Sequence, residues 1–141
     1  MISFVFEDIS PIRGLKKKVF KEFVVEMIHE EGFQSGDLSF VFCSDEFLLD
    51  VNRKYLNHDY YTDIITFDYS EKQVVSGDMM ISVDRTKENA FDEGVDQMTE
   101  LSRVMIHGVL HLCGYKDKSD LEEKEMRSKE NHYLKKLKDK Y

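Results

Sequence analysis

Two histidines and one aspartate form the most chemically specific pattern in this sequence. His107 and His111 lie four residues apart in an apolar stretch, and Asp117 follows after Gly114. Residues four apart on a helix point about 40° apart, so both imidazoles can face one ion. Glycine tolerates a positive φ and lets the chain turn back, which would bring Asp117 toward the same ion. The pattern therefore predicts two nitrogen ligands and one carboxylate, with a fourth position open to water.

Three protein ligands with an open position are typical of a catalytic zinc site, whereas structural zinc sites use four protein ligands. We therefore predict one zinc ion per chain, held by His107, His111 and Asp117. Histidine pairs at this spacing also occur without metal, but the apolar helix around this pair offers few other partners. Cys113 lies only two residues after His111 and so points elsewhere, which predicts a core residue rather than a ligand.

The same spacing matches the metal-binding motif of the metzincin proteases. In those enzymes a glutamate directly follows the first histidine and acts as the general base. Here that position is Gly108, so a metallopeptidase is the less favoured alternative. We expect Gly108 to let another element pack close to the helix, or to leave room for substrate beside the ion.

Length and composition predict one cytoplasmic domain spanning residues 1–141, with no membrane segment. The first residues have neither a basic region nor an apolar core typical of a secretory signal. Two cysteines are too few for a disulfide framework, and we expect both to be reduced. The net charge of −8 argues against a general nucleic-acid binder, since phosphate contacts need a positive surface. Residues 116–141 nevertheless carry nine basic and seven acidic side chains, a balance of +2.

Hydrophobic periodicity predicts an α+β fold, with a small, mostly four-stranded mixed sheet packed against about five helices and the metal site on the central helix. Strands are expected at residues 2–6, 38–43, 63–69 and 78–83. Helices are expected from Pro11 to Gly32, from Ser44 through Tyr55, from Asp84 to Gly94, over 96–113, and from Ser119 onward. The polar segment that contains Gly77 is expected to be a loop.

Three motifs resemble the YbeY family of bacterial endoribonucleases. The stretch from His107 to Asp117, HGVLHLCGYKD, resembles the family motif H-G-x-L-H-L-x-G-Y-D-H. Residues 55–67, YLNHDYYTDIITF, resemble Y-R-G-K-D-x-P-T-[DN]-V-L-S-F, and Gly77-Asp78 opens the next strand as in the family. These matches occur in the family's order over residues 55–126, and the chain length also fits.

The resemblance implies a metal-dependent, single-strand endoribonuclease that acts in ribosomal RNA maturation and ribosome quality control by metal-assisted phosphodiester cleavage. It also implies ribosomal RNA precursor as the substrate, with small ribosomal subunit proteins as possible partners. Two positions depart from the family pattern: Asp117 replaces the third histidine, and Leu56 replaces an arginine. A carboxylate is a competent zinc ligand, although it makes the ion a weaker Lewis acid and could favour harder metals.

If the family arginine neutralises phosphate charge, another cation must do so here. Candidates are Arg53, Arg85 and Arg103, of which Arg103 lies one helical turn before His107. We therefore predict Arg103 as a catalytic residue beside the three metal ligands, although a salt-bridged structural role is an equal alternative. Four further residues could support the site or could only form turns and caps: Asp59, Thr62, Asp63 and Asp78.

A second hypothesis is a ribosome-assembly factor that cleaves RNA weakly or not at all and whose metal is structural. The acidic net charge and the missing arginine at Leu56 favour it. The basic segment around Lys135 could contact RNA, or could be a solvated helix end.

Overall fold

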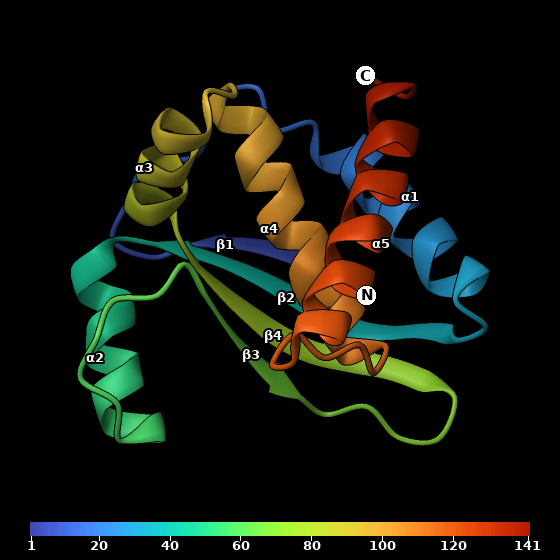
Figure 1. Ribbon diagram of the computed structural model, residues 1–141, viewed down its shortest axis with the longest axis horizontal. Coiled ribbons are helices and arrows are strands. Elements are labelled where there is room, and N and C mark those ends of the chain that lie inside the picture. Colours follow the sequence, from blue (N-terminus) through green and yellow to red (C-terminus); the bar gives the residue numbers. More distant parts are fainter.

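A four-stranded mixed sheet lies at the centre of the fold, with helices on both of its faces (Figure 1). The computed structural model describes residues 1–141. The strands are β1 (Ile2–Phe6), β2 (Gln34–Cys43), β3 (Ile64–Asp68) and β4 (Val74–Ser82). They are arranged in the order β1-β2-β4-β3; β1, β2 and β4 are parallel, and β3 is antiparallel to β4. The expected mixed sheet is therefore confirmed.

Five helices accompany the sheet, and the most apolar one is central. They are α1 (Lys17–Glu30), α2 (Asp45–Leu56), α3 (Val83–Glu93), α4 (Gln97–Leu112) and α5 (Asp120–Lys138). Figure 1 shows α4 between α3 and α5 above the sheet, whereas α2 lies apart, near the β3 edge. Helix α4 contacts β3 and β4 as well as α1, α3 and α5. The expected position of the motif-bearing helix is thus confirmed.

Alternating side chains along the strands divide the core in two. Leu38, Phe40 and Phe42 of β2 belong to the main cluster, which fills the space between the sheet and α1, α4 and α5. Cys43 belongs to a smaller cluster with Leu48 of α2. Both cysteines are free thiols, as expected, and Cys113 packs against the main core rather than toward the histidines.

Gly108 is the point of closest approach between α4 and the sheet. A Cβ atom at this position would lie 2.8 Å from Ile64 Cδ1 of β3 and 3.1 Å from Met79 Sδ of β4. Glycine inside a helix costs about 1 kcal/mol relative to alanine. The close packing of the strands explains its presence, and one of the two roles expected for this glycine is confirmed.

Local capping signals at the ends of α4 and α5 form as the sequence predicts. The Asp96 side chain accepts a hydrogen bond from the Thr99 amide at the start of α4. Gly114 has φ +104° just after the end of α4, where the chain turns back. Ser119 and Glu122 form both hydrogen bonds of a capping box at the start of α5.

Four expected boundaries are wrong. Strand β2 begins at Gln34 rather than at residue 38. The first helix begins at Lys17 rather than Pro11, because Gly14 adopts φ +82°, which is incompatible with a helix through this position. Gly77 lies inside β4 rather than in a loop, and a Cβ there would meet the Phe67 carbonyl oxygen at 2.4 Å. Helix α3 is capped by Ser82, whose side chain accepts from the Arg85 amide, and not by Asp84.

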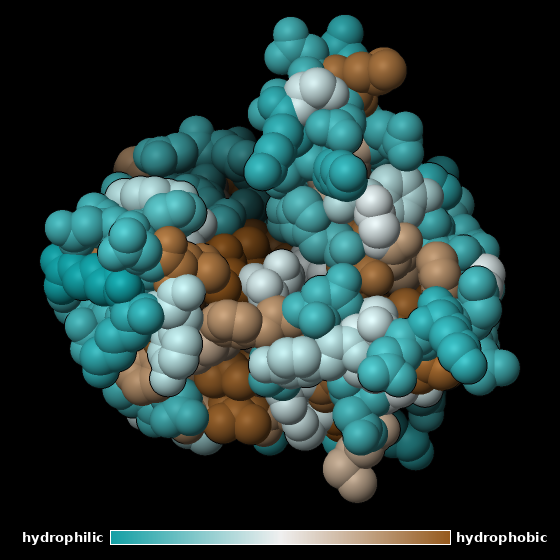
Figure 2. All heavy atoms as spheres, turned by 90° about the horizontal axis from the view of Figure 1, so that it is seen from below, coloured by the Kyte–Doolittle hydropathy of each residue, from teal (hydrophilic) through white to brown (hydrophobic).

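The surface below the sheet is hollowed. Figure 2 shows hydrophobic side chains on the floor of this hollow and hydrophilic side chains along its rims. None of the five helices combines the length and the apolar character that crossing a bilayer requires.

We expect the Gly108→Val substitution to lower the free energy of unfolding by about 1–3 kcal/mol, because the added side chain would push against Ile64 and Met79. Gly108→Ala should have a smaller effect, since its methyl group meets flexible side-chain ends and alanine favours the helix. Urea unfolding of the metal-free proteins measures both changes. A valine variant as stable as the wild type would show that this close contact does not constrain the fold.

Candidate metal centre

Helix α4 and the turn after it bring His107, His111 and Asp117 together. The Nε2 atoms of the two histidines lie 2.9 Å apart. Asp117 Oδ2 lies 3.3 Å from each of these nitrogens. The three side chains can therefore offer one ligand atom each to a single ion, as the sequence spacing predicts.

The other ring nitrogen of each histidine is already occupied. His111 Nδ1 lies 2.9 Å from the Tyr115 carbonyl oxygen, which can only accept, so this nitrogen carries the proton. His107 Nδ1 lies 2.6 Å from the Glu130 carboxylate and donates to it. In the neutral tautomers that result, both Nε2 atoms present lone pairs toward the Asp117 carboxylate.

When both histidines are neutral, these three acceptor atoms repel one another unless a cation lies between them. Histidine ligands typically bind metal through one nitrogen while the other donates to a carboxylate or a backbone carbonyl. His107 and His111 show both arrangements. The donor set therefore fits a divalent metal ion, and the two nitrogens and one oxygen are ligand types that zinc accepts.

The pKa of His107 is raised above its ordinary value. Burial works to lower this pKa, but the hydrogen bond and charge of Glu130, with further contributions from Asp117 and Asp63, outweigh it. A proton on His107 can therefore satisfy the carboxylates when no metal is bound. Metal binding must compete with that proton.

Glu130 of α5 is the main supporting residue, and the sequence analysis missed it. Its buried carboxylate contacts His107 through Oε2 and accepts from Arg103 Nη1 through Oε1 at 3.2 Å. Burial works to raise the pKa of Glu130, but its bonds to His107 and Arg103 lower it below the ordinary value. One sequence feature could have revealed this residue, because Glu130 falls on the apolar stripe of α5 between Met126 and Tyr133.

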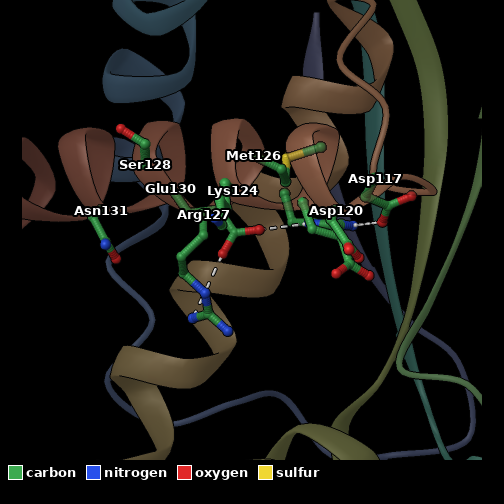
Figure 3. Close-up of a pocket in the computed structure, with 10 residues that line it drawn as sticks. Asp117, Asp120, Lys124, Met126, Arg127, Ser128, Glu130 and Asn131 are labelled. Carbon is green, nitrogen blue, oxygen red and sulfur yellow. Dashed lines mark hydrogen bonds and ion pairs between the residues drawn. The ribbon is translucent and has the colours of Figure 1, made fainter.

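A cavity of about 880 Å³ opens beside His107 and Asp117 (Figure 3). His107 and Asp117 line it, and α5 supplies the rest of its lining. The α5 residues are Asp120, Glu123, Lys124, Met126, Arg127, Ser128, Glu130 and Asn131. The polar lining makes this side of the three residues accessible to solvent.

A second cavity of about 200 Å³ lies between α3, α4 and α5 and also reaches His107. Glu100 lines it with a carboxyl group that is only 4% exposed and whose Oε1 has no hydrogen-bond partner. Burial, together with the nearby carboxylate of Glu93, raises the pKa of Glu100 to about 8. Asp63 lines the same cavity, and burial raises its pKa as well.

The predicted site residues other than His107, His111 and Asp117 do not join this group of three. Arg103 is beside the site but donates to Glu130 and to Asn131 Oδ1, the latter at 2.9 Å. Of the four residues whose roles the sequence left open, Asp63 lines the smaller cavity, whereas Asp59 pairs with Arg53. Leu56 ends α2 and is partly exposed.

A family model and full-length relatives identify the same family for this chain. The model of the family described as Endoribonuclease YbeY matches residues 7–138. A protein named Endoribonuclease YbeY from Flavobacterium psychrophilum is 49% identical over 135 residues, which cover 96% of this chain and 95% of the relative. A protein of the same name from Parabacteroides distasonis is 47% identical over 133 residues, which cover 94% of this chain and 93% of the relative. The solution structure of a Thermotoga maritima protein matches with a TM-score of 0.68 at 28% identity, covering 97% of this chain and 89% of the other.

We expect Glu130→Gln to weaken metal binding roughly 10- to 100-fold, because a neutral amide orients and polarises His107 less well than a carboxylate does. Competition with a chromophoric zinc chelator measures the affinity. Glu125→Gln, an exposed change on the same helix, serves as the control. Equal affinity in all three proteins would show that Glu130 only stabilises the fold.

We expect the free energy of unfolding of Glu100→Gln, relative to that of wild type, to rise from about pH 5 to pH 8. Above pH 8 the difference between the two proteins should stay constant. Glu100 stays protonated in the folded protein up to about pH 8 but ionises near its ordinary pKa when unfolded. Folded wild type therefore binds more protons than unfolded wild type in this interval, so its stability falls as pH rises, by at most about 1.4 kcal/mol per pH unit. Urea unfolding at several pH values tests this, and a difference that does not change with pH would contradict it.

Proposed function

The chain belongs to the YbeY endoribonuclease family, and from that membership we propose that His107, His111 and Asp117 hold the metal ion with which it cleaves RNA. The protein is an endoribonuclease of a family that matures ribosomal RNA. The observation that carries the assignment of the site is the convergence of two Nε2 atoms and one Oδ2 atom within 3.3 Å, while the Nδ1 atom of each histidine is hydrogen-bonded elsewhere.

We assign zinc as the ion, one per chain. Two imidazoles and one carboxylate that leave an open position form a ligand set of catalytic zinc sites. Held by these three residues, a divalent ion would lower the pKa of a bound water or polarise a phosphoryl oxygen. The carboxylate of Asp117 reduces the net positive charge at the ion compared with a third histidine.

The chain's own residues fix the geometry of this chemistry. Glu130 keeps His107 in the Nδ1-protonated tautomer, and the Tyr115 carbonyl does the same for His111. Arg103, predicted as catalytic, stays a prediction; its contacts with Glu130 and Asn131 support a positioning role, since they hold the carboxylate that orients His107.

We further propose that residues 1–141 act as one domain in the cytoplasm on ribosomal RNA precursor, together with small-subunit proteins. The alternative is an assembly factor with a structural metal, and the net charge of −8 favours it. A peptidase is disfavoured because Gly108, at the position of the missing general base, faces Ile64 and Met79 in the core.

Metal content and RNA cleavage measured on the same preparations test the proposal. We expect about one zinc per chain in wild type and much less in Asp117→Ala, since each ligand contributes to a three-ligand site. We expect His111→Ala to lose cleavage of single-stranded RNA. Mass spectrometry and a gel assay provide the two measurements.

Chelation separates the catalytic from the structural alternative. If the metal is catalytic, removing it abolishes activity and leaves the protein folded. If the metal is structural, removing it unfolds the protein. Circular dichroism before and after chelation reports the fold. Wild type that contains no metal even after zinc is offered, or His111→Ala that cleaves as fast as wild type, would overturn the assignment.

A further inference from the structure

If the protein cleaves RNA as proposed, the site needs a positively charged side chain near the scissile phosphate in addition to the metal ion. Phosphodiester cleavage builds negative charge on the phosphoryl oxygens, and fixed positive groups that meet this charge supply a large part of catalysis. Asp117 already offsets part of the ion's charge. Leu56, at the end of α2, has a hydrocarbon side chain and supplies no positive charge.

The arginines singled out from the sequence are engaged elsewhere. Arg103 is 17% exposed and donates to both Glu130 and Asn131. Arg53 pairs with Asp59 at 2.5 Å, and Arg85 pairs with Asp45 at 2.9 Å. None of these ion pairs leaves a guanidinium directed at the metal ligands.

Arg127 occupies a different position. It lies on α5 and lines both cavities that reach His107. Its side chain is 53% exposed, and its nearest carboxylates, Glu93 and Glu130, both lie 3.8 Å away. Both contacts are long ion pairs without a hydrogen bond, and they therefore hold the guanidinium less firmly than the shorter contacts hold Arg53, Arg85 and Arg103. Figure 3 shows Arg127 beside Glu130 at the cavity that Asp117 also lines.

Glu130 does not need Arg127 as a partner. One of its oxygens already contacts His107, and the other accepts from Arg103. Lys124 stands three residues before Arg127 on the same helical face, lines the larger cavity and forms no ion pair. The cavity is therefore lined by two basic side chains that can meet a ligand phosphate, together with four carboxylates: Asp117, Asp120, Glu123 and Glu130.

We propose that Arg127 contacts the non-bridging oxygens of the scissile phosphodiester and is the catalytic cation of this enzyme, with Lys124 holding a neighbouring phosphate of the RNA. The planar guanidinium offers two parallel donors that match a phosphate, whereas the lysine ammonium acts as a point charge. The two residues therefore have separable effects, on rate and on binding respectively.

Steady-state cleavage of single-stranded RNA tests the assignment. We expect Arg127→Ala to lower kcat roughly 100-fold or more, with the zinc content unchanged. Arg127→Lys should recover only part of this loss, because it lacks the second donor. Added methylguanidinium should raise the rate of Arg127→Ala and leave wild type unaffected. Lys124→Ala should mainly raise KM, and Arg13→Ala, which changes an exposed arginine in the loop before α1, should match wild type.

A binding measurement keeps this test separate from the test of the metal site. In the His111→Ala background, which should not cleave, adding Arg127→Ala should weaken RNA binding and reduce the slope of log affinity against log salt by about 0.7. Unchanged kcat and an unchanged salt slope in Arg127→Ala would overturn the proposal. A loss of kcat that methylguanidinium does not restore, with an unchanged salt slope, would also overturn it and indicate a structural role. Wild type that does not cleave RNA would overturn the proposed function instead, and the salt slope would still decide whether Arg127 contacts RNA.

Discussion

The hydrogen bond between the buried carboxylate of Glu130 and His107 joins α5 to α4, and the geometry of the candidate metal centre depends on it. A carboxylate in the interior is stable only when donors satisfy both of its oxygens, and here His107 and Arg103 do so. Because the bond occupies Nδ1 of His107, the opposite nitrogen is directed at His111 and Asp117. Docking of the last helix therefore sets the orientation of a ligand on the helix before it.

The surrounding packing holds these partners in register. On the sheet side, the absence of a side chain at Gly108 lets β3 and β4 approach α4 closely. On the opposite side, the loop that carries Asp117 is anchored by Tyr115, whose hydroxyl donates to Glu31 at the end of α1 at 2.6 Å. Tyr133 of α5 donates to the same carboxylate. Two of the proposed ligands thus lie on helix α4, and the third lies on a loop that Tyr115 ties to Glu31, which Tyr133 of α5 also contacts.

Charge is distributed unevenly along the chain. The chain carries a net charge of −8, but residues 116–141 carry nine basic and seven acidic side chains. Lys124 and Arg127 face the cavity beside His107 and Asp117, but four carboxylates line the same cavity. Long-range attraction of RNA by the whole protein is therefore weak, and binding must rely on local contacts and on the ion.

The sequence by itself determined the features that depend on short-range geometry. The spacing of His107 and His111, the turn at Gly114 and the caps at Asp96 and Ser119 act over a few residues, and the structure has them where the sequence indicated. Only the tertiary structure decided which distant residues meet. Glu130 lies 23 residues from His107 and 27 from Arg103, and Gly77 joins a strand because its missing side chain admits the Phe67 carbonyl. Helical periodicity identifies the face on which a residue lies, but the residue it meets across an interface depends on how whole elements dock, which no local pattern encodes.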